Sequence, residues 1–402
     1  MAKKVVLAYS GGLDTSVCIP WIKEHKGNPE VITFSADLGQ GEELDPVEAK
    51  ARKSGASKVY IEDLRERFLT EFVWPGLRAR AAYSNGYLLA TALGRPLIGA
   101  ELVRIAREND ADATAHGCTG KGNDQVRIES AVRALAPDLE VIAPLREWEM
   151  KSREEEIEYA EKMGIPVPIT KKSPYSYDRN LWGQSIECGV LEDPWTAPPE
   201  DAYQMTSNPA SAPDDPVRVE VEFEKGVPVA LDGRNLGPVE LVEKLNEIGG
   251  EHGVGRQDVV EDRLVGIKSR EIYEAPAGTI IFEAHKALMQ LTVARDLIQM
   301  AAPLSAEYGK LTYYGLWFSH QREALDGFFT QMNRVVSGRV RLRLHKGNCV
   351  VEGRQSPESL YSEALATYTT ADIFDHSAAQ GFIKLWSLPL AAEAARAHQG
   401  GK

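Results

Sequence analysis

Two glycines flanked by hydroxyl residues form the stretch of this sequence best suited to chemistry. Residues 5–9 are apolar or aromatic, and residues 10–16 read Ser-Gly-Gly-Leu-Asp-Thr-Ser before a helical pattern begins. This order predicts a strand, a tight turn and a helix N-terminus, whose free N–H groups and partial positive charge favour an anion. Glycines let a phosphate approach the backbone, and the hydroxyls add donors. Asp14 could cap the helix or face a metal ion on the phosphates.

The spacing of this run excludes two common phosphate loops. It has neither the Gly-x-x-x-x-Gly-Lys-Ser/Thr pattern of the P-loop nor the Gly-x-Gly-x-x-Gly pattern of nicotinamide-binding folds. A structural glycine turn is the simpler alternative, but hydroxyls on both sides of the glycines favour phosphate binding. The run resembles the PP-loop of the ATP pyrophosphatase superfamily, whose members cleave ATP between its α and β phosphates. In that superfamily the loop lies near the start of a Rossmann-like domain.

A second polar loop, residues 116–127, follows a short strand expected at residues 113–115 and precedes a helix. It interleaves three glycines with Thr, Lys, Asn, Asp and Arg side chains, which can bind carboxylate and amide groups. Generic loop chemistry explains the glycines but not this density of polar side chains, so we expect a binding loop. His116 could act as a general base, although a histidine that ends a buried strand is more often structural.

The elements that position these loops alternate between strands and helices. We expect strands at 5–9, 31–34, 58–61, 113–115 and 139–142, and helices at 46–54, 87–93, 99–109 and 152–163. The alternation indicates an α/β fold with a Rossmann-like parallel sheet, in which ligands bind beyond the carboxyl ends of the strands. Ala36, at one such end, could lie against adenine or simply pack. Residues 151–156 predict a capping box and a solvated face rather than a site.

The second part of the chain predicts an α+β domain. Prolines recur between residues 166 and 216, and residues 194–216 read as an exposed connector. Strands are expected at 217–223 and 227–231, helices at 238–248, 278–301 and 304–335, and a hairpin at 339–352. The hairpin arginines Arg339, Arg341 and Arg343 are most simply its solvent face.

The apolar residues of the last segment predict an oligomerisation arm. Phe382, Ile383, Leu385, Trp386 and Leu388 need a partner surface, although packing on their own chain is an alternative. We therefore expect three parts: a nucleotide-binding domain at 1–168, a synthetase domain at 169–360 and a C-terminal helical arm at 361–402.

Composition excludes several classes of protein. The chain has 402 residues, a net charge of −13 and a pI of about 5.3, which argue against a nucleic-acid binder. Four scattered cysteines indicate neither a zinc site nor a disulfide framework. No apolar run approaches the roughly 20 residues that span a bilayer, and Lys3 and Lys4 lead into a strand rather than a signal peptide. We expect a cytoplasmic protein without a membrane or nucleic-acid partner.

Taken together, these runs resemble the argininosuccinate synthase family over almost the whole chain. The markers are residues 8–16, 87–89, 116–127, 173–176 and 266–274. The first is shared with relatives that make GMP, NAD or thiolated tRNA, whereas the second loop and the Lys-Ser-Arg-Glu-Ile-Tyr-Glu run are specific to this family. Its members join L-citrulline to L-aspartate with ATP, giving argininosuccinate, AMP and pyrophosphate in arginine biosynthesis and the urea cycle.

The family's chemistry explains the residue types. A ureido oxygen is a poor leaving group, so AMP is transferred to it, and the aspartate amine then displaces AMP from citrullyl-AMP. Such a reaction needs ATP as substrate, Mg²⁺ and two oriented amino acids more than it needs a protein nucleophile. No Ser-His-Asp or Cys-His arrangement is evident, so we assign no catalytic residue and no protein metal ligand.

The resemblance implies the following contacts. The ATP residues are Ala8, Tyr9, Ser10, Gly11, Gly12, Leu13, Asp14, Thr15, Ser16, Ala36 and Gly117. The citrulline residues are Tyr87, Asn123, Arg127, Ser176, Ser185, Glu261 and Tyr273, and the aspartate residues are Thr119, Asn123 and Asp124. A homotetramer is the family expectation. Some members carry a further citrulline-binding serine where this chain has Ala92, and Thr91 could replace its hydroxyl.

The residues taken one by one also allow blander interpretations. Tyr87 and Tyr273 could be packed aromatics, Glu261 a surface acid, and Ser176 and Ser185 ordinary loop residues. Two other functions compete: another adenylating PP-loop synthetase, and a nucleotide-binding regulator that has lost turnover. A thiolase should show catalytic cysteines and a basic face, and a glutamine-dependent synthetase needs a glutaminase domain. The intact polar loops argue against a regulator.

Overall fold

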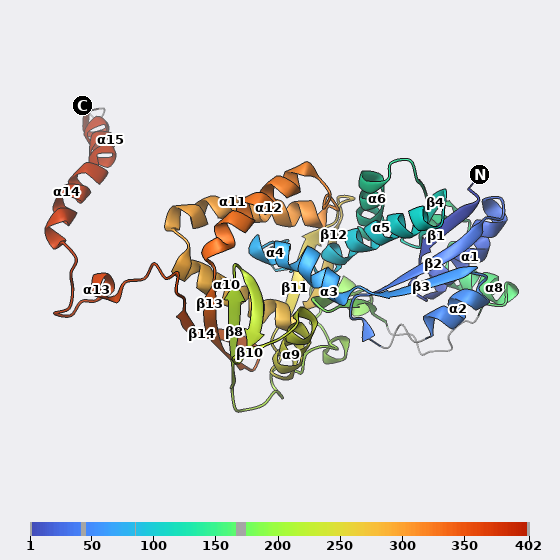
Figure 1. Ribbon diagram of the computed structural model, residues 1–402, viewed down its shortest axis with the longest axis horizontal. Coiled ribbons are helices and arrows are strands. Elements are labelled where there is room, and N and C mark those ends of the chain that lie inside the picture. Colours follow the sequence, from blue (N-terminus) through green and yellow to red (C-terminus); the bar gives the residue numbers. More distant parts are fainter. Residues whose placement is uncertain (1, 42–45, 85, 166–173, 400–402) are drawn as a thin grey trace. The chain divides into compact units, whose positions relative to one another are not determined.

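The computed structural model describes residues 2–41, 46–84, 86–165 and 174–399 (Figure 1). The chain divides into two compact units, residues 1–358 and 359–402. Among the described residues, no helix combines the length and apolar character that crossing a bilayer requires.

A five-stranded parallel sheet organises the first part of the larger unit, as expected. Its order is β3-β2-β1-β4-β5, with β1 (Lys4–Ala8), β2 (Glu30–Asp37), β3 (Lys58–Asp63), β4 (Ala113–His116) and β5 (Glu140–Ile142). Val5 and Leu7 pack in one hydrophobic cluster and Val6 in another, because successive side chains of β1 leave opposite faces of the sheet. Helices cover both faces, which explains why these strands read as continuous apolar runs.

The helices of this region are α1 (Leu13–His25), α2 (Val47–Lys53), α3 (Arg65–Arg67), the π-helix η2 (Phe68–Val73), α4 (Trp74–Arg78), α5 (Ala90–Glu108), α6 (Asp124–Leu135), α7 (Pro144–Glu147) and α8 (Arg153–Lys162). The prediction of two helices at 87–93 and 99–109 is wrong, since α5 is one helix with Pro96 inside it. Residues 87–89 lie before the helix because Leu89 has a φ of +65°, which an α-helix cannot contain. Burial of most of α5 keeps it continuous past the proline.

An antiparallel sheet of order β10-β9-β8-β13-β14 confirms the predicted strands and hairpin of the second part. Its members are β8 (Val217–Glu224), β9 (Val227–Leu231), β10 (Arg234–Asn235), β13 (Gly338–His345) and β14 (Asn348–Gln355). Arg339 and Arg341 lie on its exposed face, each within 3.2 Å of a Glu220 carboxylate oxygen. These arginines therefore belong to a solvated ion-pair network.

Helix α9 (Pro238–Glu251) forms close to where it was predicted. In place of the two long helices expected at 278–301 and 304–335, the structure has three helices. They are α10 (Pro276–Thr292), α11 (Arg295–Tyr313) and α12 (His320–Met332), followed by the 3₁₀ helix η5 (Asn333–Val335). Val293 and Ala294 are extended, and Gly315 has a φ of +75°, so the backbone leaves the helix at both places. The first break has no glycine or proline, and periodicity alone does not reveal it.

A four-stranded antiparallel sheet is the part of the fold that the sequence did not predict. Its order is β11-β12-β7-β6, with β6 (Ser176–Asn180), β7 (Gly183–Glu187), β11 (Arg256–Asp262) and β12 (Lys268–Glu274). The 3₁₀ helices η3 (Gly189–Glu192) and η4 (Glu200–Ala202) follow β7. Ser176 and Asp178 on β6, and Ser185 and Glu187 on β7, are among the residues that line a cavity. Polar residues thus occupy a strand face that would be apolar if it covered a core.

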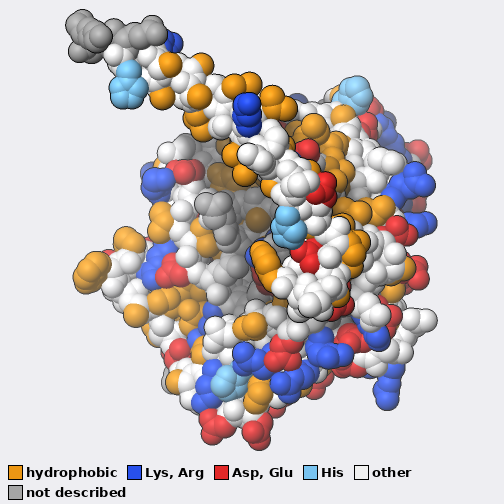
Figure 2. Space-filling view, turned by 90° about the vertical axis from the view of Figure 1, so that its left-hand side faces the viewer, with side chains coloured by type: hydrophobic (Ala, Val, Ile, Leu, Met, Phe, Trp, Pro, Cys, Tyr) orange, Lys and Arg blue, Asp and Glu red, His pale blue; other side chains and the backbone are white. Residues whose placement is uncertain are grey.

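The smaller unit consists of α13 (Glu363–Ala366), α14 (His376–Trp386) and α15 (Leu388–Gln399). Large hydrophobic side chains of α14 and α15 lie open to solvent in the single chain (Figure 2). Trp386 is 73% exposed and Leu385 is 69% exposed, as the pattern predicts.

Candidate active site

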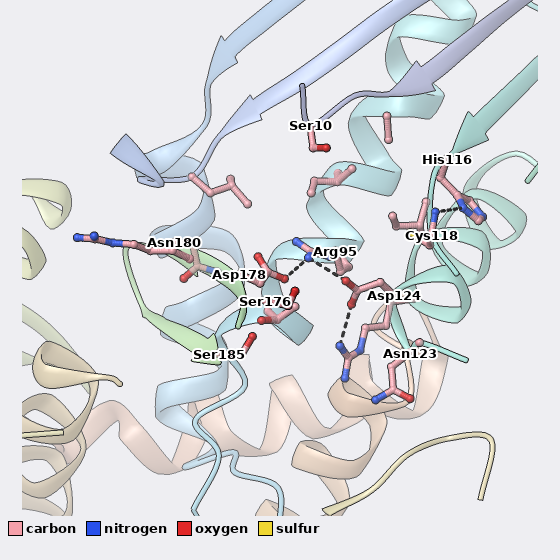
Figure 3. Close-up of a pocket in the computed structure, with 18 of the residues that line it drawn as sticks. Ser10, Arg95, His116, Cys118, Asn123, Asp124, Ser176, Asp178, Asn180 and Ser185 are labelled. Carbon is pink, nitrogen blue, oxygen red and sulfur yellow. Dashed lines mark hydrogen bonds and ion pairs between the residues drawn. The ribbon is translucent and has the colours of Figure 1, made fainter. Parts of the chain in front are cut away.

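A cavity of about 530 Å³ lies at the carboxyl ends of β1, β2 and β4 (Figure 3). Residues of α5 and α6 line it, and strands β6, β7, β11 and β12 complete its wall. β1 pairs with β2 on one side and β4 on the other, so the order in which strands are added to the sheet reverses at β1. Open parallel sheets bind their ligands at this switch point.

The turn between β1 and α1 has a backbone suited to an anion. Gly11 has a φ of +78°, a conformation that favours glycine. The Ser16 hydroxyl donates to the Gly12 carbonyl over 2.7 Å and is buried. The hydroxyls of Ser10 and Thr15 lie 3.2 Å apart and line the cavity. Ser16 therefore holds the turn, whereas Ser10 and Thr15 are placed to donate to a phosphate.

Asp14, in the first turn of α1, contacts helix α8. Its carboxylate lies 3.9 Å from the Arg153 guanidinium and interacts with Glu156. Burial, and then the Asp14 carboxylate, raise the pKa of Glu156 to about 7. Ser152 accepts the N–H of Glu155 over 3.3 Å, as the predicted cap requires. The helix α8 is therefore not wholly solvated, because its Glu156 contacts Asp14 in the first turn of α1.

The loop after β4 approaches α1 closely. A Cβ on Gly117 would lie 2.7 Å from the Thr15 Cγ2, so a larger residue cannot fit without movement. His116 is buried, with Nε2 3.1 Å from Glu129 and Nδ1 accepting the Cys118 N–H over 3.2 Å. Both ring nitrogens have protein partners, which favours the structural interpretation of this histidine.

Arg95 joins two carboxylates at the centre of the cavity wall (Figure 3). Its Nη2 lies 2.8 Å from Asp124 and also contacts Asp178, while Arg127 Nη1 lies 3.1 Å from Asp124. Burial alone would raise the pKa of Asp124, but the two guanidinium groups outweigh it and the pKa is lowered. Burial dominates at Asp178, where the pKa is raised. Asp124 is therefore held as a carboxylate.

Glu261 is a buried carboxylate that two phenols approach. It accepts the Tyr273 hydroxyl over 2.6 Å and the Tyr313 hydroxyl over 2.5 Å. Glu271, also on the wall, lies 3.0 Å from the Tyr273 hydroxyl. Burial, and then the Glu261 and Glu187 carboxylates, raise the pKa of Glu271 to about 7. These acids line the cavity and can receive an ammonium group.

Tyr87 is both a packed aromatic and a wall residue. Its ring stacks on Tyr273 with centroids 4.1 Å apart, and its hydroxyl accepts the N–H groups of Thr91 and Ala92 at the start of α5. The Thr91 hydroxyl is buried at the wall near the Tyr87 hydroxyl and the Asp178 carboxylate, and it makes no hydrogen bond of ordinary geometry to any described residue. A buried hydroxyl without a protein partner is a group that a ligand can satisfy.

The cavity brings together most of the predicted site residues. Its wall includes Ala8, Tyr9, Ser10, Thr15, Ala36, Tyr87, Gly117, Thr119, Asn123, Asp124, Arg127, Ser176, Ser185, Glu261 and Tyr273. Gly11, Gly12, Leu13, Asp14 and Ser16 belong to the adjoining turn and helix start but do not line this cavity.

Sequence reasoning missed several polar wall residues, namely Gln40, Arg95, Asp178, Glu187, Arg263 and Glu271. Two of them had a usable signal. Arg95 follows Thr91 by four residues on α5, and Asp178 follows Ser176 by two on β6, so each shares a face with a residue already considered. Arg263 and Glu271 become neighbours, 3.2 Å apart, only through strand pairing.

Comparison with known proteins identifies the family. Residues 4–166 match the model of the arginosuccinate synthase N-terminal HUP domain, and residues 175–393 match that of the arginosuccinate synthase C-terminal domain. The chain is 56% identical to the argininosuccinate synthase of Carboxydothermus hydrogenoformans, over 98% of each chain. It is 55% identical to that of Desulfitobacterium hafniense over 99% of each, and 56% identical to that of Gloeobacter violaceus over 96% of this chain and 97% of the relative. The chain belongs to the argininosuccinate synthase family.

Proposed function

We propose that this chain ligates L-citrulline and L-aspartate with ATP, releasing AMP and pyrophosphate by way of citrullyl-AMP. The observation that carries the proposal is one cavity lined both by Ser10 and Thr15, which flank the glycine turn, and by the buried side chains of Arg127 and Glu261. A phosphate group at the turn and an α-amino acid at Arg127 and Glu261 would share this single cavity.

ATP is proposed to lie along residues 8–16, with its phosphates at the Ser10 and Thr15 hydroxyls and at the N-terminus of α1. Ala36 lies at the end of β2, where the apolar side chains of Phe34 and Leu38 also line the cavity. This apolar end suits a flat base. Gly117 lines the cavity in close contact with Thr15, and its backbone is proposed to approach the nucleotide.

Citrulline is proposed to place its carboxylate at Arg127 and its ammonium group at Glu261, since each receptor carries the opposite charge. Tyr87, Asn123 and Tyr273 would contact the same amino-acid head. Ser176 and Ser185 lie on adjacent strands of the wall and would bind the ureido group.

Aspartate is proposed to bind at the loop after β4, through Thr119, Asn123 and Asp124. Asp124 is held as an acceptor for an ammonium group by Arg95 and Arg127. We assign no protein nucleophile, because the reaction needs the ureido oxygen and then the aspartate amine to be oriented more than it needs covalent attack by a side chain.

Mg²⁺ is proposed as a companion of the ATP phosphates. It prefers oxygen ligands and usually keeps waters and phosphate oxygens with one or two carboxylates. Within the described part of the chain, no group of three or more His, Cys, Asp or Glu is placed to hold a metal. Asp14, at the start of α1 beside the glycine turn, is the carboxylate that would face an ion on the phosphates. When bound, the ion would neutralise charge on the phosphates.

We also propose three parts, at residues 1–168, 169–360 and 361–402, and a cytoplasmic homotetramer. The exposed apolar face of α14 and α15 supports association. Arginine biosynthesis follows from the family, and a place in the urea cycle is a further proposal.

The test measures AMP, pyrophosphate and argininosuccinate with ATP, Mg²⁺ and citrulline, with and without aspartate. Aspartate-dependent AMP release with argininosuccinate as product would support the proposal. Turnover only with another acceptor would favour a different adenylating synthetase. ATP binding without any turnover would favour the non-catalytic regulator.

A further inference from the structure

Tyr313, the last residue of α11, stands behind the cavity wall and touches several of its residues. Its hydroxyl donates to Glu261 over 2.5 Å and accepts from the Asn123 amide over 2.8 Å. Its backbone carbonyl accepts the Arg127 Nε–H over 3.0 Å. One residue from the second part of the chain thus contacts the proposed receptors for both ends of an amino acid.

The hydroxyl of Tyr313 is a fixed donor. The side chain is fully buried, and its ring stacks on Tyr83 with centroids 3.6 Å apart and planes 9° from parallel. Burial, and then the Glu261 carboxylate, raise the pKa of its phenol, so it stays protonated at neutral pH. The Arg127 guanidinium lies 4.8 Å from the centroid of the Tyr313 ring. Arg127 therefore contacts both the ring and the backbone carbonyl of Tyr313.

The Asn123 amide completes the connection. Its nitrogen donates to Tyr313, and its oxygen accepts the Leu264 N–H over 3.0 Å. Asn123 is proposed to contact both substrates, while Glu261 and Arg127 are proposed to hold citrulline. The three side chains come from β11 and from the start of α6, and Tyr313 is a contact that they share.

We propose that Tyr313 is a positioning residue that fixes Glu261, Asn123 and Arg127 at the spacing that an α-amino acid head requires. The inference rests on the proposed citrulline site. Tyr313 does not line the cavity, so it acts through these residues rather than on citrulline itself. Its hydroxyl would therefore determine affinity and selectivity for the amino-acid acceptor and leave nucleotide binding unaffected.

Tyr313→Phe tests this role because it removes the hydroxyl and keeps the stacked ring. A hydrogen bond to a charged group contributes enough to binding that we expect the KM for citrulline to rise roughly tenfold. The KM for ATP should stay within about twofold of the wild-type value, and kcat should change less than the KM for citrulline. A purely structural role would lower the melting temperature and the active fraction without separating the two KM values.

Tyr308→Phe is the matched control. Tyr308 is also fully buried on α11, but its hydroxyl donates to Asp326 over 2.7 Å, away from the cavity. Its loss should affect stability and leave both KM values unchanged. A double variant with Glu261→Gln should show a smaller effect of Tyr313→Phe than the wild-type background does, because the shared acceptor has lost its charge.

The outcomes distinguish this proposal from the proposed function. Wild-type protein that makes no argininosuccinate would overturn the function first. Active wild-type protein with an unchanged KM for citrulline in Tyr313→Phe would overturn the positioning role alone. Equal increases in the KM values for citrulline and ATP would also overturn it.

Discussion

Gly117 lies so close to Thr15 that a Cβ on the glycine would stand 2.7 Å from the threonine Cγ2. This contact joins the loop after β4 to the helix start that follows the glycine turn. The two loops that the sequence marks as polar therefore meet directly, and their spacing depends on a missing side chain.

Gly117→Ala should weaken ATP binding, because the added methyl must displace Thr15 or its loop. We expect the KM for ATP to rise by at least tenfold, measured by initial rates at saturating citrulline and aspartate. Gly120→Ala is the control, since its nearest neighbour would be the Arg146 Cγ at 3.9 Å. Equal KM values for ATP in the two variants would contradict the steric argument.

Arg95→Gln should abolish most activity and destabilise the fold. It leaves the half-buried carboxylates of Asp124 and Asp178 with one fewer cation, and loss of hydrogen bonds to such charged groups costs about 1–3 kcal/mol. We expect kcat/KM for aspartate to fall by more than a hundredfold and thermal unfolding to begin at lower temperature. Arg104→Gln, on the same helix but paired with Glu62, Glu101 and Glu108, should retain activity. Wild-type activity in Arg95→Gln would rule out a role for this cluster.

Thr91→Val should raise the KM for citrulline several-fold without lowering stability. The buried hydroxyl lies near Tyr87 and Asp178 but makes no hydrogen bond of ordinary geometry, so its removal should cost the folded protein little. Thr114→Val is matched to it, because the Thr114 hydroxyl is likewise buried without a partner but lies on β4 outside the wall. A citrulline KM that both variants leave unchanged would show that Thr91 does not replace the family's serine.

Stability should depend on pH through Glu156. Its pKa is about 7 in the folded protein, above the ordinary glutamate value, so the folded state holds a proton that the unfolded state releases. The contribution of this group is present at about pH 4 and is lost as pH rises toward 7. Glu156→Gln should therefore gain stability relative to wild type on going from pH 5 to pH 8, by about 1 kcal/mol after solvent screening.

Glu158→Gln provides the comparison for this measurement, because Glu158 is exposed on the same helix. Chemical unfolding of both variants at pH 5 and pH 8 gives the difference. A Glu156→Gln effect that is the same at both pH values would contradict the proton-linked explanation.

Deletion of residues 378–402 should lower the assembly state. The apolar side chains of α14 are exposed in the single chain, and burying them against another copy would stabilise an oligomer. Light scattering of the deleted protein beside the full chain gives the mass of each. An unchanged number of copies in the assembly would mean that another surface holds them together. Trp386→Asp tests the same face with the arm retained.

The sequence alone determined the features of this protein that depend on neighbouring residues, namely its strands, turns and exposed apolar side chains. Apolar strands followed by glycines and hydroxyls predict the parallel sheet and the turn at Ser10–Ser16, because backbone propensity and side-chain periodicity act over a few residues. The hairpin at β13 and β14 and the exposed apolar residues of α14 follow from equally local patterns. Most of the site residues that the family-specific runs predicted lie on the cavity wall, although they make up less than half of it.

Only the tertiary structure decided which distant side chains share the site. Asn123 meets Tyr313 across 190 positions of sequence, and Arg95 meets Asp178 across 83. The strands β6, β7, β11 and β12 were not predicted, because polar residues that line a cavity break the apolar alternation typical of a half-buried strand. The burial of the Glu261 carboxylate was not predicted either. Its neighbours Tyr273 and Tyr313 come from other elements, and no local sequence pattern predicts that they contact it.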